Sequence, residues 1–211
     1  MGEKIKLNIT TQKTVLDTVS SNEIVVVDIK KDEQVQYAIL ALKDFAKNIT
    51  FNIIGKNAQL EVIVICLQRS NQKADIKIVQ HHKNQYGTST NLIKTILKDS
   101  ATFNFNGLIK IDKDARQTNA FLTQNTLTLS ENTTNHSVPS LEINADDVKA
   151  SHSATTSFVD EKELYYLKSR GINQQNSGNL ILEGFINSAV EKIVDETIKR
   201  KIEKKVEEYF K

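Results

Sequence analysis

Residues 139–172 read PSLEINADDVKASHSATTSFVDEKELYYLKSRGI, and the hydrophobic period of the chain changes within this stretch. Before it, apolar residues come in short runs or alternate with polar ones, which is typical of β-strands. After it, they recur every three or four residues, which is typical of helices. The stretch also holds His152, whose neighbours from 150 to 154 are small residues that leave the imidazole uncrowded.

The first hundred residues predict a series of short strands. Alternating or β-branched runs occur at residues 4–10, 23–29, 49–54, 60–67, 76–79 and 91–96. Residues 36–45 fit either a short helix or a buried strand. The chain has one proline, so asparagine and serine supply most turn residues. Polar turns between short strands are compatible with a stacked β-solenoid.

Motifs appear one after another from residue 101 onward. They are FNFNGLIKI at 103–111, Gln117 with Ala120, LTLS at 127–130, LEI at 141–143, ADDVK at 145–149, SHSAT at 151–155, LYYL at 164–167 and SRGI at 169–172. Together they resemble the core signature of the SufB/SufD proteins, scaffold subunits of the Suf iron–sulfur cluster assembly machinery. The resemblance implies a mainly β fold with C-terminal helices. It places a right-handed parallel β-helix core at residues 1–158 and a small helical domain at 159–211.

The helical part carries its own boundary signals. Asp160 and Glu163 form a capping-box pattern at a helix start. Gly171 stands where a helix of this kind ends in a left-handed residue. Asn173 can cap the next helix, whose apolar stripe comprises Ile181, Phe185, Ala189 and Ile193.

A second apolar stripe marks the last segment, on a charged background. It consists of Ile198, Ile202, Val206 and Phe210. This spacing puts all four on one narrow helix face. The residues alone leave two alternatives, packing on the domain itself or docking a partner. In the SufB/SufD family the C-terminal helices bind the SufC ATPase, so the resemblance implies a SufC-type ATPase partner at this face.

The resemblance also singles out His152 as a possible iron or cluster ligand. It aligns with a SufD histidine thought to contribute to cluster formation near the SufB–SufD contact, and neutral imidazole is a suitable iron ligand. The alternative is a histidine hydrogen-bonded on the solenoid surface. SufB-type members carry a thiolate in the strand around residues 122–129, where this chain has Gln124 and Asn125, and a glutamate in place of His152. The chain therefore resembles SufD.

Iron–sulfur clusters mostly demand thiolates, so a cluster here would be transient and shared with a second subunit. The partner would be a SufB-like chain or another copy. The expected contact is the edge at Leu141, Ile143, Val148 and His152, because edge strands have unpaired backbone groups. Nothing in the sequence supports a flavin. The alternative function is a β-solenoid interaction or structural protein that has lost cluster chemistry.

Other reactive side chains are interpreted structurally. Cys66 lies in an apolar strand and is expected to be a buried hydrophobe. His81 and His82 are adjacent on a strand, so they point to opposite faces and form no metal site with His136. Asp146 and Asp147 fit turn or edge positions. Tyr165 and Arg170 of the family signature are expected to hold a helix against the solenoid.

The bulk properties exclude several function classes. The 211 residues have a formal charge of +2, too small to favour nucleic acid, and 39% are hydrophobic. No run approaches the roughly 18 apolar residues of a membrane helix. The N-terminus lacks an apolar signal segment, and the single cysteine fits a reducing, cytoplasmic compartment. The chain has no phosphate loop, no G-x-S-x-G and no H-E-x-x-H, so we expect a scaffold rather than an enzyme.

Overall fold

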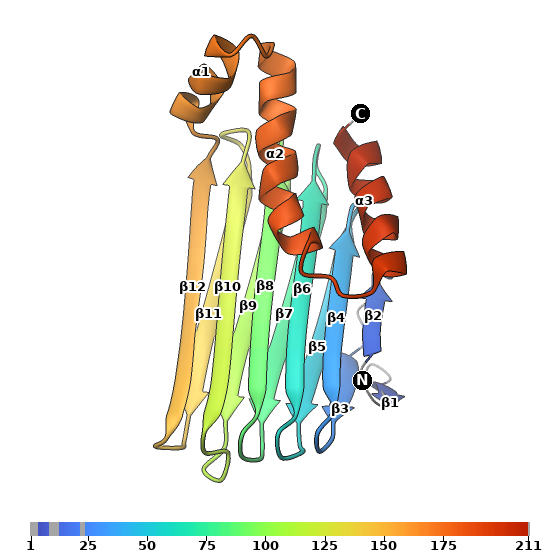
Figure 1. Ribbon diagram of the computed structural model, residues 1–211, viewed down its shortest axis with the longest axis vertical. Helices are drawn as coiled ribbons and strands as arrows, with labels where there is room; N and C mark the ends of the chain where they lie inside the picture. Colours follow the sequence, from blue (N-terminus) through green and yellow to red (C-terminus); the bar gives the residue numbers. More distant parts are fainter. Residues whose placement is uncertain (1–3, 9–12, 22–23, 211) are drawn as a thin grey trace.

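The computed structural model describes residues 4–8, 13–21 and 24–210. Two parallel sheets of six strands each dominate it (Figure 1). The odd sheet runs in the order β1 (Lys4–Asn8), β3 (Ile24–Ile29), β5 (Phe45–Ile53), β7 (Lys73–His82), β9 (Thr102–Ile111) and β11 (Thr134–Ile143). The even sheet runs in the order β2 (Lys13–Asp17), β4 (Gln34–Ala41), β6 (Gln59–Gln68), β8 (Thr88–Leu97), β10 (Thr118–Thr128) and β12 (Val148–Phe158).

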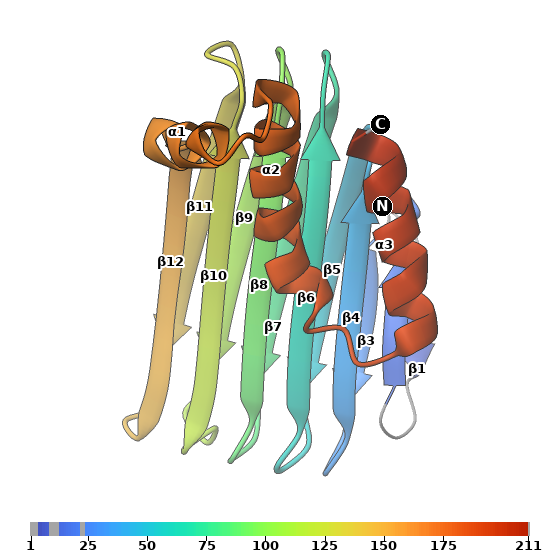
Figure 2. The ribbon, with the colours of Figure 1, turned by 45° about the horizontal axis from the view of Figure 1, so that its top comes forward.

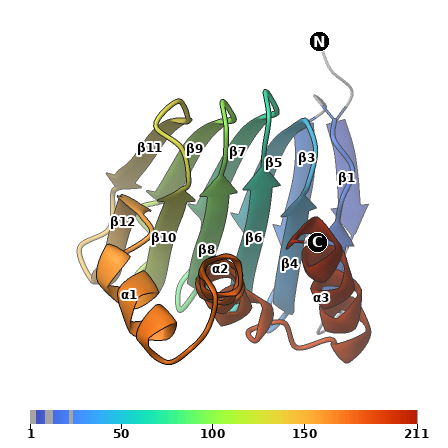
Figure 3. The same cartoon turned by 90° about the horizontal axis from the view of Figure 1, so that it is seen from above.

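The chain alternates between the two sheets, so each coil adds one strand to each (Figure 3). This confirms the predicted β-solenoid. Coil length grows along the chain: 20 residues separate the paired Lys4 and Ile24, whereas 32 separate Thr102 and Thr134. A changing repeat length leaves no fixed period to read from the sequence. Residues 9–10 and 23 of the first two predicted strands lie outside the described residues.

The ambiguous segment 36–45 is a strand followed by a turn. It contains most of β4 and the start of β5 at Phe45. Nearly every residue of β4 is buried, because Tyr37 and Ile39 face the solenoid interior while Ala38 and Leu40 face the helices. Burial on both faces removes the alternation that identifies a half-exposed strand.

Polar residues in left-handed conformation make the turns. They are Asp32, Asn57, Ser70, Tyr86, Asp99 and Gln117, with φ between 56° and 62°. The turns also bond from coil to coil: the Asn57 side-chain amide donates to Asp32 Oδ1 at 3.0 Å, and the Ser70 N–H donates to Asp99 Oδ2 at 2.9 Å. The predicted use of asparagine and serine in place of glycine and proline is confirmed at Asn57 and Ser70, and the other four positions hold Asp, Tyr or Gln.

Three helices follow the last strand, namely α1 (Glu161–Ser169), α2 (Gln174–Val190) and α3 (Glu196–Phe210). Asp160 caps α1 by accepting from the Lys162 N–H at 2.8 Å, and Asn173 caps α2 by accepting from the Asn176 N–H at 2.9 Å. Gly171 has φ 87° and ends α1. The Ile172 N–H then donates back to the Leu167 carbonyl at 3.3 Å, the bond expected of a Schellman motif.

The helices share a hydrophobic core with the outer side of the even sheet. Helix α2 lies over β6 and β8, and α3 lies beside β4 and β2 (Figures 1 and 2). The main core fills the space between the two sheets, and a second core joins the even sheet to α2 and α3. In the described part of the chain, no helix has the length and apolar character needed to cross a membrane.

Candidate functional site

The last coil forms an uncovered end of the solenoid. Strands β11 and β12 are the final strands of their sheets. Leu141 and Ile143 pair in register with Ile109 and Ile111, which are core residues, so they belong to the inward-facing row. His152 pairs in register with Leu122, also in the core, and faces inward too. These side chains would be buried if another coil followed.

Their exposure reflects this terminal position. Leu141 is 37% exposed and Ile143 is 41% exposed, while their counterparts one coil earlier are fully buried. His152 is exposed, and no group among the described residues hydrogen-bonds its ring. Val148 is half-buried and packs against the main core. Three of the four predicted contact residues are therefore exposed at the uncovered end, on both of its strands.

Polar side chains occupy other positions of the last coil. The Asn135 amide donates to Thr156 Oγ1 at 2.7 Å and links β11 to β12. On the outward face, the Asn125 amide donates to Thr155 Oγ1 at 2.8 Å. The end thus offers one free imidazole, an amide and several hydroxyls. No described histidine, cysteine or carboxylate joins His152 in a cluster of three potential metal ligands.

The remaining reactive residues lie elsewhere. Cys66 is buried, and burial raises the pKa of its thiol to about 12. His81 faces outward and lies 2.9 Å from Asp112, whereas His82 faces inward and its Nε2 lies 2.7 Å from Ser89 Oγ. The prediction that the adjacent histidines point to opposite faces is confirmed. Asp146 and Asp147 lie exposed between β11 and β12.

The predicted partner-binding stripe of α3 lies against its own sheet. Ile202 is fully buried and Val206 is 4% exposed, both in the second core. Ile198 and Phe210 are half-buried beside them. The structure thus shows the first of the two alternatives, packing on the domain itself. Contact of a partner with this helix stays a prediction.

A different apolar surface lies between α1 and α2. Helix α1 has no buried residue, and a groove of about 440 Å³ beside it is lined mainly by Tyr166, Leu167, Leu180 and Ile181. Tyr165 is 76% exposed, and the Arg170 guanidinium lies 5.2 Å from the ring centroid of Tyr166 on α1. The prediction that Tyr165 and Arg170 hold the helix to the solenoid is therefore wrong. Both residues lie at the surface of a helix that touches little of the chain.

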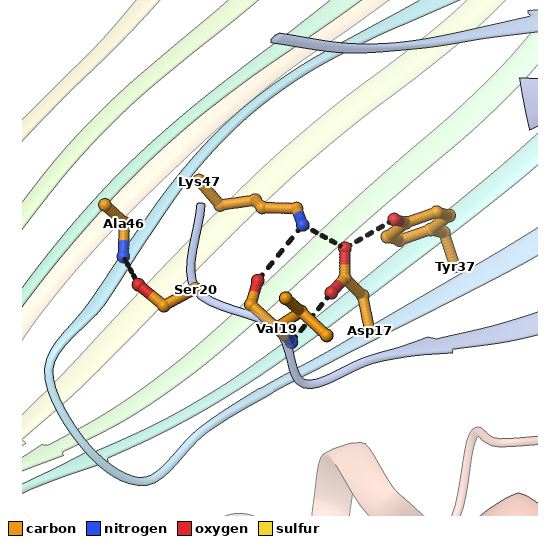
Figure 4. Close-up of polar contacts among 6 residues, drawn as sticks. All are labelled: Asp17, Val19, Ser20, Tyr37, Ala46 and Lys47. Carbon is orange, nitrogen blue, oxygen red and sulfur yellow. Dashed lines mark hydrogen bonds and ion pairs between the residues drawn. The ribbon is translucent and has the colours of Figure 1, made fainter. Parts of the chain in front are cut away.

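A buried ionic cluster in the first coils had no signal in the sequence. Asp17 at the end of β2 lies 2.8 Å from Lys47 Nζ and accepts from the Tyr37 hydroxyl at 2.7 Å (Figure 4). Lys47 also donates to the Val19 carbonyl at 3.1 Å. All three side chains are nearly inaccessible, and burial with the Asp17 hydrogen bond raises the pKa of Tyr37. The cluster links β2, β4 and β5 inside the first coils.

Comparison with known proteins agrees with the family resemblance that the sequence motifs indicate. Residues 4–185 match the family model described as "SUF system FeS cluster assembly, SufBD core domain". The chain is 34% identical over 155 residues to the iron–sulfur cluster assembly protein SufD of Escherichia coli, covering 74% of this chain and 37% of that protein. It is 29% identical over 184 residues to SufD of Bacillus subtilis, covering 86% and 42%.

A SufBD family protein of Pyrococcus horikoshii is 28% identical over 140 residues, which covers 66% of this chain and 31% of the archaeal protein. The chain therefore spans well under half the length of the curated relatives it matches. The family model covers most of the chain, including the whole solenoid from β1 to β12 and much of α2. The protein belongs to the SufB/SufD core family of the SUF iron–sulfur cluster assembly system, and within it resembles SufD.

Proposed function

We propose that the protein is a scaffold subunit of a SUF-type iron–sulfur cluster assembly complex and not an enzyme. The observation that supports this most is the uncovered end of the solenoid. Solenoids need a polar cap or a partner over their terminal coil, and here inward-facing Leu141 and Ile143 are exposed instead. The proposed compartment is the cytoplasm, where a single thiol stays reduced.

The proposed partner at this end is a SufB-like subunit or a second copy of the chain. Parallel edge strands β11 and β12 present unpaired backbone groups that a second solenoid can continue. His152 would then face the cluster under assembly, which is cargo of the complex. Because Cys66 is buried with a raised thiol pKa, a second copy of the chain would bring no accessible thiolate, so the thiolates that the cluster requires come from a SufB-like partner.

An open-end variant tests this assignment. The double substitution Leu141→Lys and Ile143→Lys puts two charges on the apolar surface of the expected contact. We expect roughly 100-fold weaker association with the SufB-like subunit, since unpaired charges in an interface cost several kcal/mol. The matched control Val138→Lys with Ser140→Lys changes the outward face of the same strand, because these residues pair in register with outward-facing Asn106 and Leu108.

Association is measured by co-purification and light scattering after co-expression with the SufB-like and SufC-type chains of the same genome. Circular dichroism verifies that each variant is folded. If the open-end variant associates as well as the control does, the partner binds elsewhere and the proposal fails at this surface.

We further propose that a SufC-type ATPase docks on the C-terminal helices. The α1–α2 groove supports this, since Tyr166 and Leu180 are exposed there while Ile202 and Val206 of α3 are buried. Leu180→Asp should abolish co-purification of the ATPase and leave the fold intact. Ile202→Asp should instead destabilise the protein, because Ile202 is fully buried in the second core. Loss of the ATPase with Ile202→Asp in a folded protein would place the docking surface on α3.

A second candidate function is an interaction protein of the same fold without cluster chemistry. The buried Cys66 favours it, because this chain then supplies one imidazole and no thiolate. The two functions differ in one measurement: iron and sulfide bound by the reconstituted complex. A complex that forms through the uncovered end, yet binds the same iron with or without His152, supports the second function.

A further inference from the structure

Two primary amides lie inside the solenoid without hydrogen-bond partners. Gln80 on β7 is fully buried and Asn91 on β8 is 2% exposed. Neither the oxygen nor the nitrogen of either amide has a partner among the described residues. A buried polar group without a partner loses its hydration and gains nothing in return. Four such atoms close together indicate that a molecule absent from the protein chain itself forms hydrogen bonds with them.

The two amides occupy the same layer of the interior. Next to the turn that joins β7 to β8, His82 Nε2 and Ser89 Oγ lie 2.7 Å apart, so these two positions face each other. Gln80 is two residues before His82, and Asn91 is two residues after Ser89. Both therefore point inward at about 7 Å further from the turn, since a strand rises about 3.3 Å per residue.

The side chains around this layer cannot satisfy the amides. Gln80 pairs in register with Phe51 and Ile109 on the adjacent coils. Asn91 pairs in register with Val62 and Leu122. All four neighbours are buried and apolar, and His82 and Ser89 bond each other. The amides could at most bond one another, which would still leave half of their N–H groups and carbonyl lone pairs unused.

We propose that Gln80 and Asn91 bind ordered water inside the solenoid. The ligand must both donate and accept, because each amide offers N–H groups and a carbonyl oxygen. A cation would leave the N–H groups unpaired and an anion would leave the carbonyls unpaired. The apolar neighbours also provide no opposite charge. Water fits both groups, and buried water typically makes about three hydrogen bonds to such atoms.

The hydrated layer is separate from the uncovered end. The row that contains Asn91 continues through Leu122 to His152. Leu122 is 1% exposed and stands between the two. The site therefore does not depend on the function proposed above, and failure of one leaves the other standing.

A crystal structure of the wild-type protein, at a resolution that orders internal solvent, tests the site directly. We expect a solvent peak within about 2.7–3.2 Å of an amide atom of both Gln80 and Asn91. A direct amide–amide pair with no solvent peak overturns the proposal. An anomalous signal that identifies the peak as a metal ion overturns it as well.

Thermal unfolding of variants provides a second test. Gln80→Leu and Asn91→Leu should each lower Tm by about 3–10 °C, because each leaves the other amide and its water poorly bonded. The double variant should recover most of that loss. Gln80→Leu combined with Gln68→Leu is the matched control: Gln68 donates to the Ala41 carbonyl at 3.1 Å near the far end of β6, so these losses should add. Additive losses for Gln80 and Asn91 would overturn a shared site.

Discussion

The first coils and the last coil of the solenoid differ in the inward-facing side chains that they carry and in how far these side chains are buried. In the first coils, Asp17, Lys47 and Tyr37 meet inside the solenoid, and Ser20 Oγ accepts from the Ala46 N–H at 2.9 Å (Figure 4). The Ser21 N–H donates to the Ala46 carbonyl at 2.8 Å. At the last coil, inward-facing side chains are exposed. The difference is that charged side chains meet inside the first coils, whereas apolar side chains and an imidazole are exposed at the last coil. An end left uncovered is then a surface suited to another subunit.

The largest expected effect on stability concerns the buried Asp17–Lys47 ion pair of the first coils. Lys47→Met removes one partner of a nearly inaccessible ion pair and leaves the Asp17 carboxylate buried beside Tyr37. Removal of one partner of a buried pair costs about 3–5 kcal/mol of the free energy of unfolding. Urea denaturation measures it.

The double variant Asp17→Leu with Lys47→Met is the informative companion. Because it removes both charges, it should be much closer to wild type than Lys47→Met. Lys31→Met is the exposed control, since the Lys31–Asp32 pair is 3.9 Å long and largely solvated. A Lys47→Met protein as stable as Lys31→Met would show that the stability of the first coils does not depend on this ion pair.

The second prediction compares two inward-facing histidines, His82 inside the solenoid and His152 at its uncovered end. Burial lowers the pKa of His82 to about 4 from its ordinary 6.5. Below pH 6.5, His82 binds a proton in the unfolded chain but stays neutral in the folded protein. The free energy of unfolding therefore falls as the pH falls. The loss begins near pH 6.5, is complete near pH 4, and amounts to about 3 kcal/mol.

The measurement is the free energy of unfolding at pH 7 and at pH 4.5 for wild type, His82→Gln and His152→Gln. The decrease between these pH values should be smaller in His82→Gln than in wild type by about 2–3 kcal/mol. His152→Gln is the matched substitution of an exposed histidine. Equal decreases in all three proteins would show that His82 is protonated in the folded state.

The third prediction concerns the linker between α2 and α3, which is hydrogen-bonded to β4. The Gln36 amide donates to the Lys192 carbonyl at 2.8 Å and accepts from the Val194 N–H at 3.0 Å, which fastens the α2–α3 linker to β4. Gln36→Ala should cost about 1–2 kcal/mol and speed proteolysis of the linker, because two backbone groups lose their partner. Gln34→Ala, on the same face of β4 but exposed, should leave both measurements unchanged. If the linker is cleaved at the same rate in both variants, the packing of α3 and not the Gln36 hydrogen bonds keeps the linker in place.

Local patterns predicted the fold where one face of an element is exposed. Helix caps at Asp160 and Asn173 depend on adjacent residues, and both were predictable. Gly107 marks a close approach inside β9: an added Cβ would lie 2.5 Å from Leu122 Cδ1, while the β9 register stays regular. Segment 36–45 was ambiguous because β4 is buried on both faces.

Contacts between coils were beyond the sequence. Asp17 on β2 and Lys47 on β5 meet across coils of different length, with 22 residues from Lys13 to Val35 and 24 from Ile24 to Asn48, so no fixed spacing in the sequence identifies the pair. The stripe of α3 has the same pattern whether it packs on its own sheet or on a partner, so only the structure shows Ile202 buried. The exposure of His152 follows from its place in the last coil, which no local pattern records.

The smallest expected effect on stability is at His152, and it bears most directly on the proposed function. His152 is exposed and its ring makes no hydrogen bond with the described residues, so His152→Ala should change the free energy of unfolding by less than about 0.5 kcal/mol. Association through Leu141 and Ile143 should persist as well. What we expect to fall is the iron and sulfide bound by the complex reconstituted with the SufB-like and SufC-type subunits.

The reason is that a cluster shared across the contact loses an imidazole ligand, and imidazole and thiolates are the groups that hold iron. His136→Ala is the matched control, because His136 lies on the same terminal coil but pairs in register with outward-facing Asn104. Iron content, acid-labile sulfide and the visible absorption of the cluster are measured for both variants. A normal cluster yield with His152→Ala, in a complex of normal composition, would remove the ligand role. The uncovered end would then be a contact surface alone, and the protein an interaction scaffold without cluster chemistry.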